Sequence, residues 1–240
     1  MKRLTKEEVD DLSKRLDTPQ DVLRWAMDAF PGAIALAWSG AEDVAVLDMM
    51  WRIDPRRTRV FTLDTGRLNP ETYELIDAVR GKYQVPIDVM FPQAKDVEAM
   101  VREKGMNLFY QSIENRKACC QVRKVEPLNR ALAGLDGWIT GLRKSQSVTR
   151  GRLSKVEIDP VHGKIAKVNP LCDWSTAQVF DYMAAHGVPK NKLHEQGYPS
   201  IGCAPCTRAV KPGEDERAGR WWWENPDSKE CGLHPNPFNK

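Results

Sequence analysis

Hydrophobic and polar positions alternate along the chain between short apolar runs and longer amphipathic stretches. The apolar runs resemble buried strands in length and composition, and they cover residues 33–38, 59–63, 87–91 and 138–142. The amphipathic stretches repeat apolar residues at helical spacing, and they cover residues 43–51, 70–81, 94–104 and 121–132. Strands and helices in this order predict a parallel sheet with right-handed crossovers.

Capping residues predict two helices before the first strand. Thr5 with Glu8 forms a capping box. Thr18 followed by Pro19 has the N-cap and N1 pattern of a second helix, which reaches about Phe30. The chain therefore opens with two amphipathic helices.

Further elements follow the last apolar run. Residues 155–159 and 164–168 predict a hairpin, and Ser175 caps a helix that reaches about Ala185. Beyond it turn-forming residues crowd the chain, and we predict one short charged helix over residues 214–223.

These elements define the fold class as α/β, with a mainly parallel twisted sheet flanked by helices. A chain of 240 residues suits one well-buried domain with an appendage better than two independent domains. We therefore predict an α/β domain over residues 1–206 and a mobile C-terminal segment over residues 207–240.

The charge balance excludes some classes of function. The chain has 36 Lys and Arg against 33 Asp and Glu, so its net charge of +3 gives no support for binding to nucleic acid or to a membrane. No apolar run is long enough to span a bilayer, and residues 1–8 lack the apolar region of a signal peptide. We expect a cytoplasmic protein, in which any anion site is a local cluster of cations.

Two strand ends carry residues that suit phosphate. Ser39, Gly40 and Asp43 lie between a buried strand and a helix, where backbone N–H groups and the helix dipole favour an anion. A second strand ends in Leu63-Asp64-Thr65-Gly66-Arg67, and Leu63, Thr65 and Gly66 are candidates for the same nucleotide crevice. Ordinary strand-to-helix turns remain the alternative. A further candidate, Gly141, lies near the end of the strand 138–142, and the cations Arg143, Lys144 and Arg150 follow this strand.

Four of the six cysteines form a possible metal site. Cys119 and Cys120 are adjacent, and Cys203 and Cys206 form a Cys-x-x-Cys element. Four thiolates can close a tetrahedral zinc site or hold an iron-sulfur cluster, and the ligands alone favour the cluster only modestly. Nearby cations could offset the charge of such a cluster, namely Arg116, Lys117, Arg123 and Lys124.

The remaining two cysteines differ in their surroundings. Cys172 lies at an apolar strand end, which predicts a buried structural thiol. Cys231 lies in the polar, glycine-flanked sequence Lys229-Glu230-Cys231-Gly232, which suits an accessible, reactive thiol, with an idle surface thiol as the alternative. Upstream, Arg217 and Arg220 are three residues apart on the predicted helix, where they could bind a sulfate or phosphate group through forked hydrogen bonds.

Taken together, these motifs resemble the bacterial adenylyl sulfate (APS) reductases within the assimilatory sulfonucleotide reductases. The resemblance covers nearly the whole chain, in six ordered segments: 39–43, 63–67, 117–120, 202–206, 217–224 and 230–234. It implies an adenine-nucleotide α-hydrolase-like fold and a [4Fe-4S] cluster, held by the two cysteine pairs, that does not itself supply electrons.

The resemblance also implies roles for single residues. Cys231 matches the nucleophile that attacks the sulfur of APS and becomes an S-sulfocysteine, which thioredoxin then reduces. Lys124 matches a lysine between cluster and substrate, whereas Arg150, Arg217 and Arg220 match residues around the phosphosulfate. The expected partners are APS and thioredoxin, and a homo-oligomer is compatible with the sequence.

Two departures from the loop sequence of the wider superfamily narrow the range of activities that we expect. Ala41 and Val44 replace a glycine and a serine of the ATP-cleaving loop, which argues against ATP cleavage. An ATP-dependent iron-sulfur tRNA sulfur transferase is the rival enzyme, but the near-neutral charge disfavours it. A metal-stabilised interaction module is the non-enzymatic alternative, and the preference for APS over its 3′-phosphorylated form, PAPS, stays open.

Overall fold

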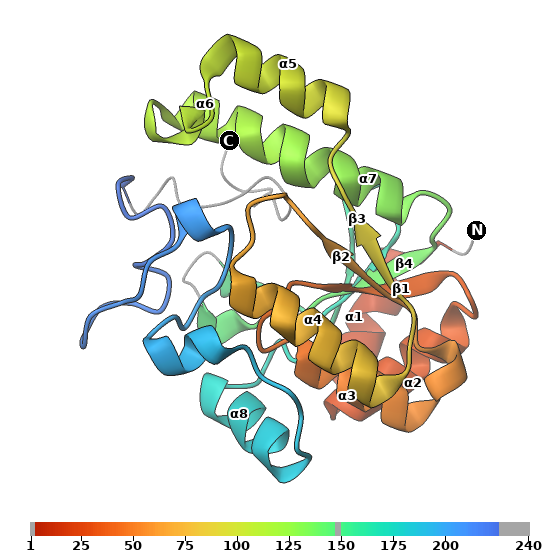
Figure 1. Ribbon diagram of the computed structural model, residues 1–240. Coiled ribbons are helices and arrows are strands. Elements are labelled where there is room, and N and C mark those ends of the chain that lie inside the picture. Colours follow the sequence, from red (N-terminus) through yellow and green to blue (C-terminus); the bar gives the residue numbers. More distant parts are fainter. Residues whose placement is uncertain (1–2, 147–149, 226–240) are drawn as a thin grey trace. The chain divides into compact units, whose positions relative to one another are not determined.

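The structure is a computed structural model that describes residues 3–146 and 150–225. A six-stranded sheet has the strand order β3-β2-β1-β4-β6-β5 (Figure 1). The strands are β1 (Ile34–Trp38), β2 (Val60–Leu63), β3 (Ile87–Met90), β4 (Gly137–Ile139), β5 (Val156–Ile158) and β6 (Ala166–Val168).

The pairing of the strands confirms the predicted parallel sheet. Leu36 of β1 is in register with Val60 of β2 on one side and with Ile139 of β4 on the other, and both pairs are parallel. Strand β6 continues the parallel sheet beside β4, and β5 pairs with it antiparallel as the predicted hairpin.

Eight α-helices occur in the described chain. They are α1 (Lys6–Arg15), α2 (Pro19–Ala29), α3 (Val44–Ile53), α4 (Pro70–Tyr83), α5 (Ala94–Lys104), α6 (Ile113–Cys120), α7 (Glu126–Leu132) and α8 (Thr176–Ala185). Thr5, Thr18 and Ser175 each make a reciprocal capping box at the start of α1, α2 and α8. The three predicted helix starts are therefore confirmed.

The chain forms two compact units that interleave along the sequence. The first unit comprises Met1–Thr62, Pro70–Asp88 and Gly134–Lys192, and the second comprises Leu63–Asn69, Val89–Ala133 and Leu193–Lys240. Leu36, Val46 and Ile139 are fully buried in the core of the first unit, and Phe109 and Trp221 belong to a smaller apolar cluster in the second. The division at residue 206 stays a prediction.

Two helix predictions are corrected. The helix predicted from residue 121 begins at Ile113, because α6 continues through a π-helical turn, Gln121–Val125, into α7. The helix predicted over 214–223 is wrong. Arg220 instead forms an antiparallel bridge with Thr207, and the Gly219 carbonyl accepts a hydrogen bond from Arg208 N at 3.0 Å. Pairing with a distant segment has replaced local helical bonds there.

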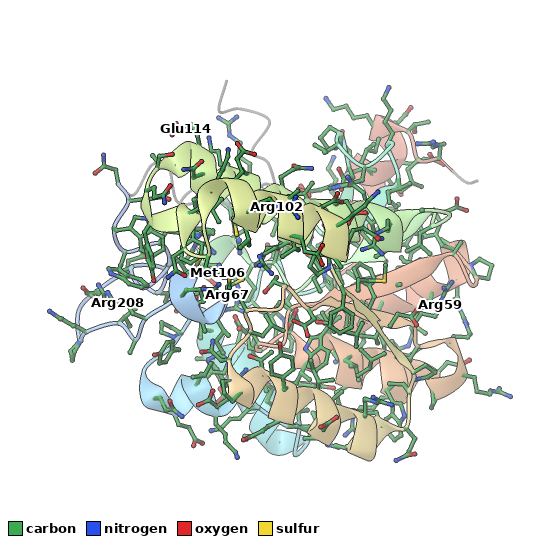
Figure 2. All side chains as sticks on the ribbon, turned by 45° about the horizontal axis from the view of Figure 1, so that its top comes forward. Arg59, Arg67, Arg102, Met106, Glu114 and Arg208 are labelled. Atoms are coloured by element: carbon green, nitrogen blue, oxygen red, sulfur yellow. The ribbon has the colours of Figure 1, made fainter. Side chains whose placement is uncertain are left out.

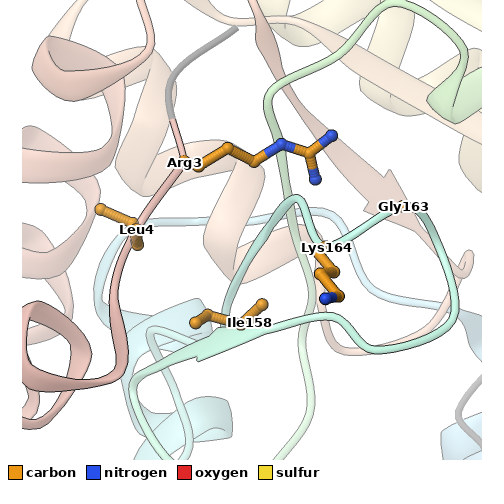
Figure 3. A pocket seen from close by; sticks show the side chains of 5 residues that line it. All are labelled: Arg3, Leu4, Ile158, Gly163 and Lys164. Atoms are coloured by element: carbon orange, nitrogen blue, oxygen red, sulfur yellow. The ribbon is translucent and has the colours of Figure 1, made fainter.

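Among the described residues, no helix is both long enough and apolar enough to cross a bilayer. A shallow pocket in the first unit lies between the start of the described chain and the β5–β6 hairpin (Figure 3). Two cations, Arg3 and Lys164, and two apolar residues, Leu4 and Ile158, line it. It contains none of the site residues that the sequence predicts.

Candidate active site

The loop after β1 is organised by the carboxylate of Asp43. Asp43 Oδ2 accepts a hydrogen bond from Ser39 N at 2.6 Å, and Oδ1 accepts one from Ala41 N at 3.2 Å. Gly40 between them has a φ of +79°, a conformation that glycine adopts without strain. The predicted phosphate loop is therefore a tight turn that leads into α3.

Close backbone contacts hold this loop from two sides within the first unit. A Cβ atom on Gly141 would lie 2.3 Å from the Asp43 Cβ, and one on Gly40 would lie 2.7 Å from Thr72 Cγ2. The amide of Asn191 donates to the Gly40 carbonyl at 2.9 Å. Gly141, a substrate-binding candidate from the sequence, thus lies against the loop that contains Ser39, Gly40 and Asp43. Asn191 is an additional contact of this loop that the sequence gave no reason to single out.

Asp43 is fully enclosed, and this burial raises the pKa of its carboxyl to about 7. Hydrogen bonds from Ser39 and Ala41 oppose the shift, and the neighbouring charge of Glu42 adds to it. A carboxyl that is half protonated near neutral pH changes the charge of the loop over the physiological range.

Glu42, which the sequence did not single out, forms a buried ion pair with Arg143. Glu42 Oε1 lies 2.8 Å from Arg143 Nη1, and the two side chains are 8% and 1% exposed. Gln146 donates to the same carboxylate oxygen at 3.1 Å, and Arg150 donates in turn to Gln146 Oε1. Arg143 is therefore not a free cation of the loop, whereas Arg150 is linked to the phosphate loop through Gln146 and Glu42.

The loop after β2 belongs to the second unit and contacts a cysteine. Thr65 Oγ1 lies 3.2 Å from Cys203 Sγ and accepts a hydrogen bond from Arg67 N at 3.2 Å. Asp64 Oδ1 accepts from Gly66 N at 2.7 Å, and Arg123 Nη1 donates to the Thr65 carbonyl at 2.6 Å. Of the residues predicted to bind nucleotide here, Leu63 ends β2, and Thr65 and Gly66 lie on the loop that reaches the cysteine site.

Arg67 ties this loop to the chain before α6. Its guanidinium donates to the Met106 carbonyl at 3.3 Å and to Asn107 Oδ1 at 2.9 Å, and Figure 2 shows Arg67 next to Met106. The Arg67 carbonyl accepts from Ala204 N at 2.8 Å, within the Cys-x-x-Cys element.

The structure brings the four predicted metal ligands together. Cys119, Cys120, Cys203 and Cys206 all line one pocket of the second unit. Burial raises the pKa of Cys206 to about 12, and the charges of Cys203 and Cys120 add to this effect. Burial also raises the pKa of Cys119, although Arg123 opposes it. Without a bound metal, the thiols of Cys206 and Cys119 therefore favour their protonated forms, and a metal centre would supply the positive charge that holds them as thiolates.

Cations and a buried donor surround the thiols. Three of the four cations predicted beside the pair line the pocket, namely Arg116, Arg123 and Lys124, and Arg67 joins them. The indole Nε1 of Trp221 is buried in the same apolar cluster without a hydrogen-bond acceptor. This environment fits an anionic iron-sulfur cluster, whose sulfur atoms accept hydrogen bonds. Among the described residues, no three His, Cys, Asp or Glu side chains are placed to hold a single metal ion.

Arg217 and Arg220 do not share a helix face, because no helix forms there. Arg220 is only 7% exposed, donates to the Ile201 carbonyl at 3.2 Å and packs against Gly202, where an added Cβ would lie 2.5 Å from Nη2. Arg217 is more accessible, and its backbone N–H donates to Asp215 Oδ1 at 2.8 Å. The two arginines therefore have different surroundings.

The structure describes one of the two remaining cysteines, Cys172, and does not describe the other, Cys231. Cys172 is 1% exposed, and burial raises the pKa of its thiol to about 12, which confirms the predicted buried thiol. Cys231 lies outside the described residues, so its role as the nucleophile stays a prediction.

The parallel sheet and the tight turn after β1 agree with the class of protein that comparison with known families gives. The chain belongs to the family of phosphoadenosine phosphosulfate reductase domains, whose family model matches residues 33–209. The adenosine 5′-phosphosulfate reductase of Burkholderia cepacia is 58% identical over 175 residues, which cover 73% of this chain and 70% of that protein. The 5′-adenylylsulfate reductase 3, chloroplastic, of Arabidopsis thaliana is 48% identical over 238 residues, which cover 95% of this chain.

The comparisons confirm the family resemblance and the fold. A crystal structure of the phosphoadenylyl-sulfate (PAPS) reductase from Candida auris, as a phosphate complex, superposes with a TM-score of 0.74 at 32% identity and covers 86% of this chain and 98% of that one. The chain spans about half the length of the Arabidopsis thaliana reductase, because the match covers 51% of it.

Proposed function

We propose that this protein is an APS reductase, which converts adenylyl sulfate to sulfite and AMP in sulfate assimilation. The observation that carries the proposal is the contact between Thr65 and Cys203, because it joins a strand-end loop of the nucleotide type to the pocket of four thiols. The printed names of the bacterial and plant relatives support the same substrate and reaction.

We propose that Cys119, Cys120, Cys203 and Cys206 hold a [4Fe-4S] cluster. Their convergence on one pocket and the surrounding cations support this ligand set. When bound, the cluster supplies a fixed charged framework, and the electrons for the reaction come from an external dithiol, which we take to be thioredoxin.

The proposed chemistry has two steps on Cys231. In the first, the Cys231 thiolate attacks the sulfur of APS, the bond from that sulfur to the bridging oxygen breaks, and AMP leaves with the electron pair. In the second, a thiolate of the reductant attacks the Cys231 sulfur and expels sulfite. The reductant's second thiol then resolves the mixed disulfide, so two electrons pass to the substrate sulfur and Cys231 is regenerated.

The remaining site residues bind and orient the substrate in this proposal. Ser39, Gly40, Asp43 and Gly141 form the phosphate loop, and Leu63, Thr65 and Gly66 form the second strand-end loop. Lys124, Arg150, Arg217 and Arg220 are the proposed anion ligands. Because Arg220 also has internal contacts, replacing it would disturb local packing, and Arg217→Ala is the cleaner test of anion binding.

Dual use of APS and PAPS is a second candidate, favoured by the likeness to the Candida auris structure. The two nucleotides differ by one 3′-phosphate, so parallel assays with each nucleotide measure the preference directly. A cytoplasmic location is also proposed, since the net charge and composition suit it.

A single-turnover experiment tests the proposed function. Anaerobically purified protein is mixed with APS without reductant, and the released AMP and the adduct-bearing peptide are measured. We expect about one AMP per chain, if one thiol reacts once, and a sulfonate adduct on the peptide that contains Cys231. Added thioredoxin should then release sulfite.

Two cysteine variants serve as controls for this experiment. Cys231→Ser should form no adduct, because a hydroxyl is a far poorer nucleophile than a thiolate. Cys172→Ser should still form it, because Cys172 is buried and its thiol keeps its proton. An adduct on Cys172, or turnover by Cys231→Ser, would contradict the mechanism.

A further inference from the structure

A buried ion pair connects α6 with the last described residues of the chain. Arg116 Nε lies 2.9 Å from Glu224 Oε1, and Arg116 Nη2 lies 2.8 Å from Oε2, so the contact is bidentate. The two side chains are 1% and 3% exposed. A fully desolvated, forked pair fixes both groups in one geometry, because either charge alone would be buried without compensation.

The two parts of the chain that this ion pair joins each contact one of the cysteine pairs. Arg116 lies three residues before Cys119 and lines the pocket of the four thiols. Burial lowers the pKa of Arg116, but hydrogen bonds and charges from Glu224 and then from Cys120 hold it above its ordinary value. On the other side, Trp221 N donates to the Cys206 carbonyl at 3.0 Å.

The indole of Trp221 completes this connection. The Arg116 guanidinium lies 4.6 Å from the centroid of the Trp221 ring, and the Arg220 guanidinium lies 4.7 Å from it. Cation–π contacts of this kind strengthen when they are removed from water. The residues 220–224 are therefore bound to the helix that carries one cysteine pair and to the turn that carries the other.

We propose that Arg116 and Glu224 are positioning residues, which hold residues 220–224 against the two cysteine pairs and so couple the order of this segment to occupancy of the four-cysteine pocket. This inference rests on the proposed function, because it takes the pocket to hold the cluster. The coupling is reciprocal by thermodynamic linkage. The bound cluster stabilises the ion pair of Glu224 with Arg116, and the ion pair stabilises the bound cluster by the same free energy.

The second unit contains a matched control pair. Arg208 and Glu214 also form a bidentate contact, with N–O distances of 2.8 and 2.9 Å, but their side chains are 33% and 29% exposed. Neither residue lines the cysteine pocket. Glu214→Gln therefore removes the same kind of contact from the same unit without touching the proposed connection.

The test uses the full chain, purified anaerobically with its iron. Amide hydrogen exchange is measured on peptides that cover residues 216–225, where the backbone amides of Arg220, Trp221 and Glu224 are hydrogen-bonded, and the rate of iron loss to a chelator is followed in the same samples. In Glu224→Gln we expect exchange in these peptides to be several-fold faster than in wild type before any iron has left, and iron loss to be several-fold faster. Glu224→Asp should recover part of both, and Glu214→Gln should match wild type.

If Glu224→Gln does not fold, Arg116→Lys tests the same coupling. Arg116→Lys keeps the charge but loses the fork, so we expect intermediate values of both rates. Unchanged exchange and iron loss in these variants, or equal changes in Glu214→Gln, would overturn the coupling. Wild-type protein without iron would instead refute the proposed cofactor, and iron-loaded wild type that forms no Cys231 adduct would refute the proposed reaction.

Discussion

Gly141 lies so close to Asp43 that a methyl group on Gly141 would be 2.3 Å from the Asp43 Cβ. The neighbouring atom is near the backbone of the phosphate loop, so it cannot move without moving the loop. We expect Gly141→Ala to weaken nucleotide binding at least tenfold, which corresponds to about 1.4 kcal/mol. Equilibrium binding of APS to the Cys231→Ser background measures this effect without turnover.

A second glycine provides the control for this substitution. Gly81 lies in α4, and an added Cβ there would meet no atom within 4 Å. Gly81→Ala should leave nucleotide binding unchanged and raise helix stability by about 0.5–1 kcal/mol. Wild-type affinity in Gly141→Ala would show that the loop tolerates displacement and would contradict its proposed role.

The buried pair of Glu42 and Arg143 should dominate the local stability of the first unit. Glu42→Ala leaves the Arg143 guanidinium buried without its carboxylate, which typically costs about 3–5 kcal/mol. Lys192 and Glu74 form an exposed pair, with side chains 68% and 56% exposed, so Glu74→Ala should cost less than about 1 kcal/mol. Urea unfolding of both variants gives the comparison, and equal costs would contradict this account.

Asp43 should make stability depend on pH in a defined direction. Because its folded-state pKa is raised to about 7 from 3.8, the folded protein binds more protons than the unfolded chain between these values. The contribution of Asp43 to the free energy of unfolding therefore falls as pH rises from about 4 to about 7, by about 1.4 kcal/mol for each unit of pKa difference.

Asp43→Asn tests this pH dependence. The amide cannot ionise, so the difference in unfolding free energy between wild type and variant should change with pH over this range and level off above it. A constant difference between wild type and Asp43→Asn would mean that Asp43 keeps an ordinary pKa.

Thr65 should slow the loss of bound iron through its hydroxyl. Thr65→Val keeps the side-chain shape but removes the group that lies 3.2 Å from Cys203 Sγ, so a thiolate at Cys203 would lose a hydrogen bond worth about 1 kcal/mol. We expect iron release to a chelator to be about five times faster, and Thr65→Ser to release iron at nearly the wild-type rate. Equal rates in Thr65→Val and wild type would show that the hydroxyl does not serve the metal site.

Local sequence determined most of the secondary structure and which residues are candidates for the site. Capping boxes at Thr5, Thr18 and Ser175 involve partners three residues away, so the chain specifies them locally. Alternating strands and helices likewise predict a parallel sheet, because each strand must bury both faces under the crossovers. The two cysteine pairs could likewise be recognised from the sequence as candidate metal ligands, since residue type and spacing are local properties.

Tertiary structure decided which charges are paired and which are available. From the sequence, Arg143 and Arg116 are both predicted to be cations that could bind an anion. Their carboxylate partners, Glu42 and Glu224, lie 101 and 108 positions away in the sequence. The helix predicted over 214–223 fails for a related reason. Arg220 forms a bridge with Thr207, and only isolated turns remain locally, such as the one closed by the hydrogen bond from Arg220 N to the Arg217 carbonyl. Periodicity and spacing report contacts within a few residues, whereas burial of a charge depends on segments that only the folded chain brings together.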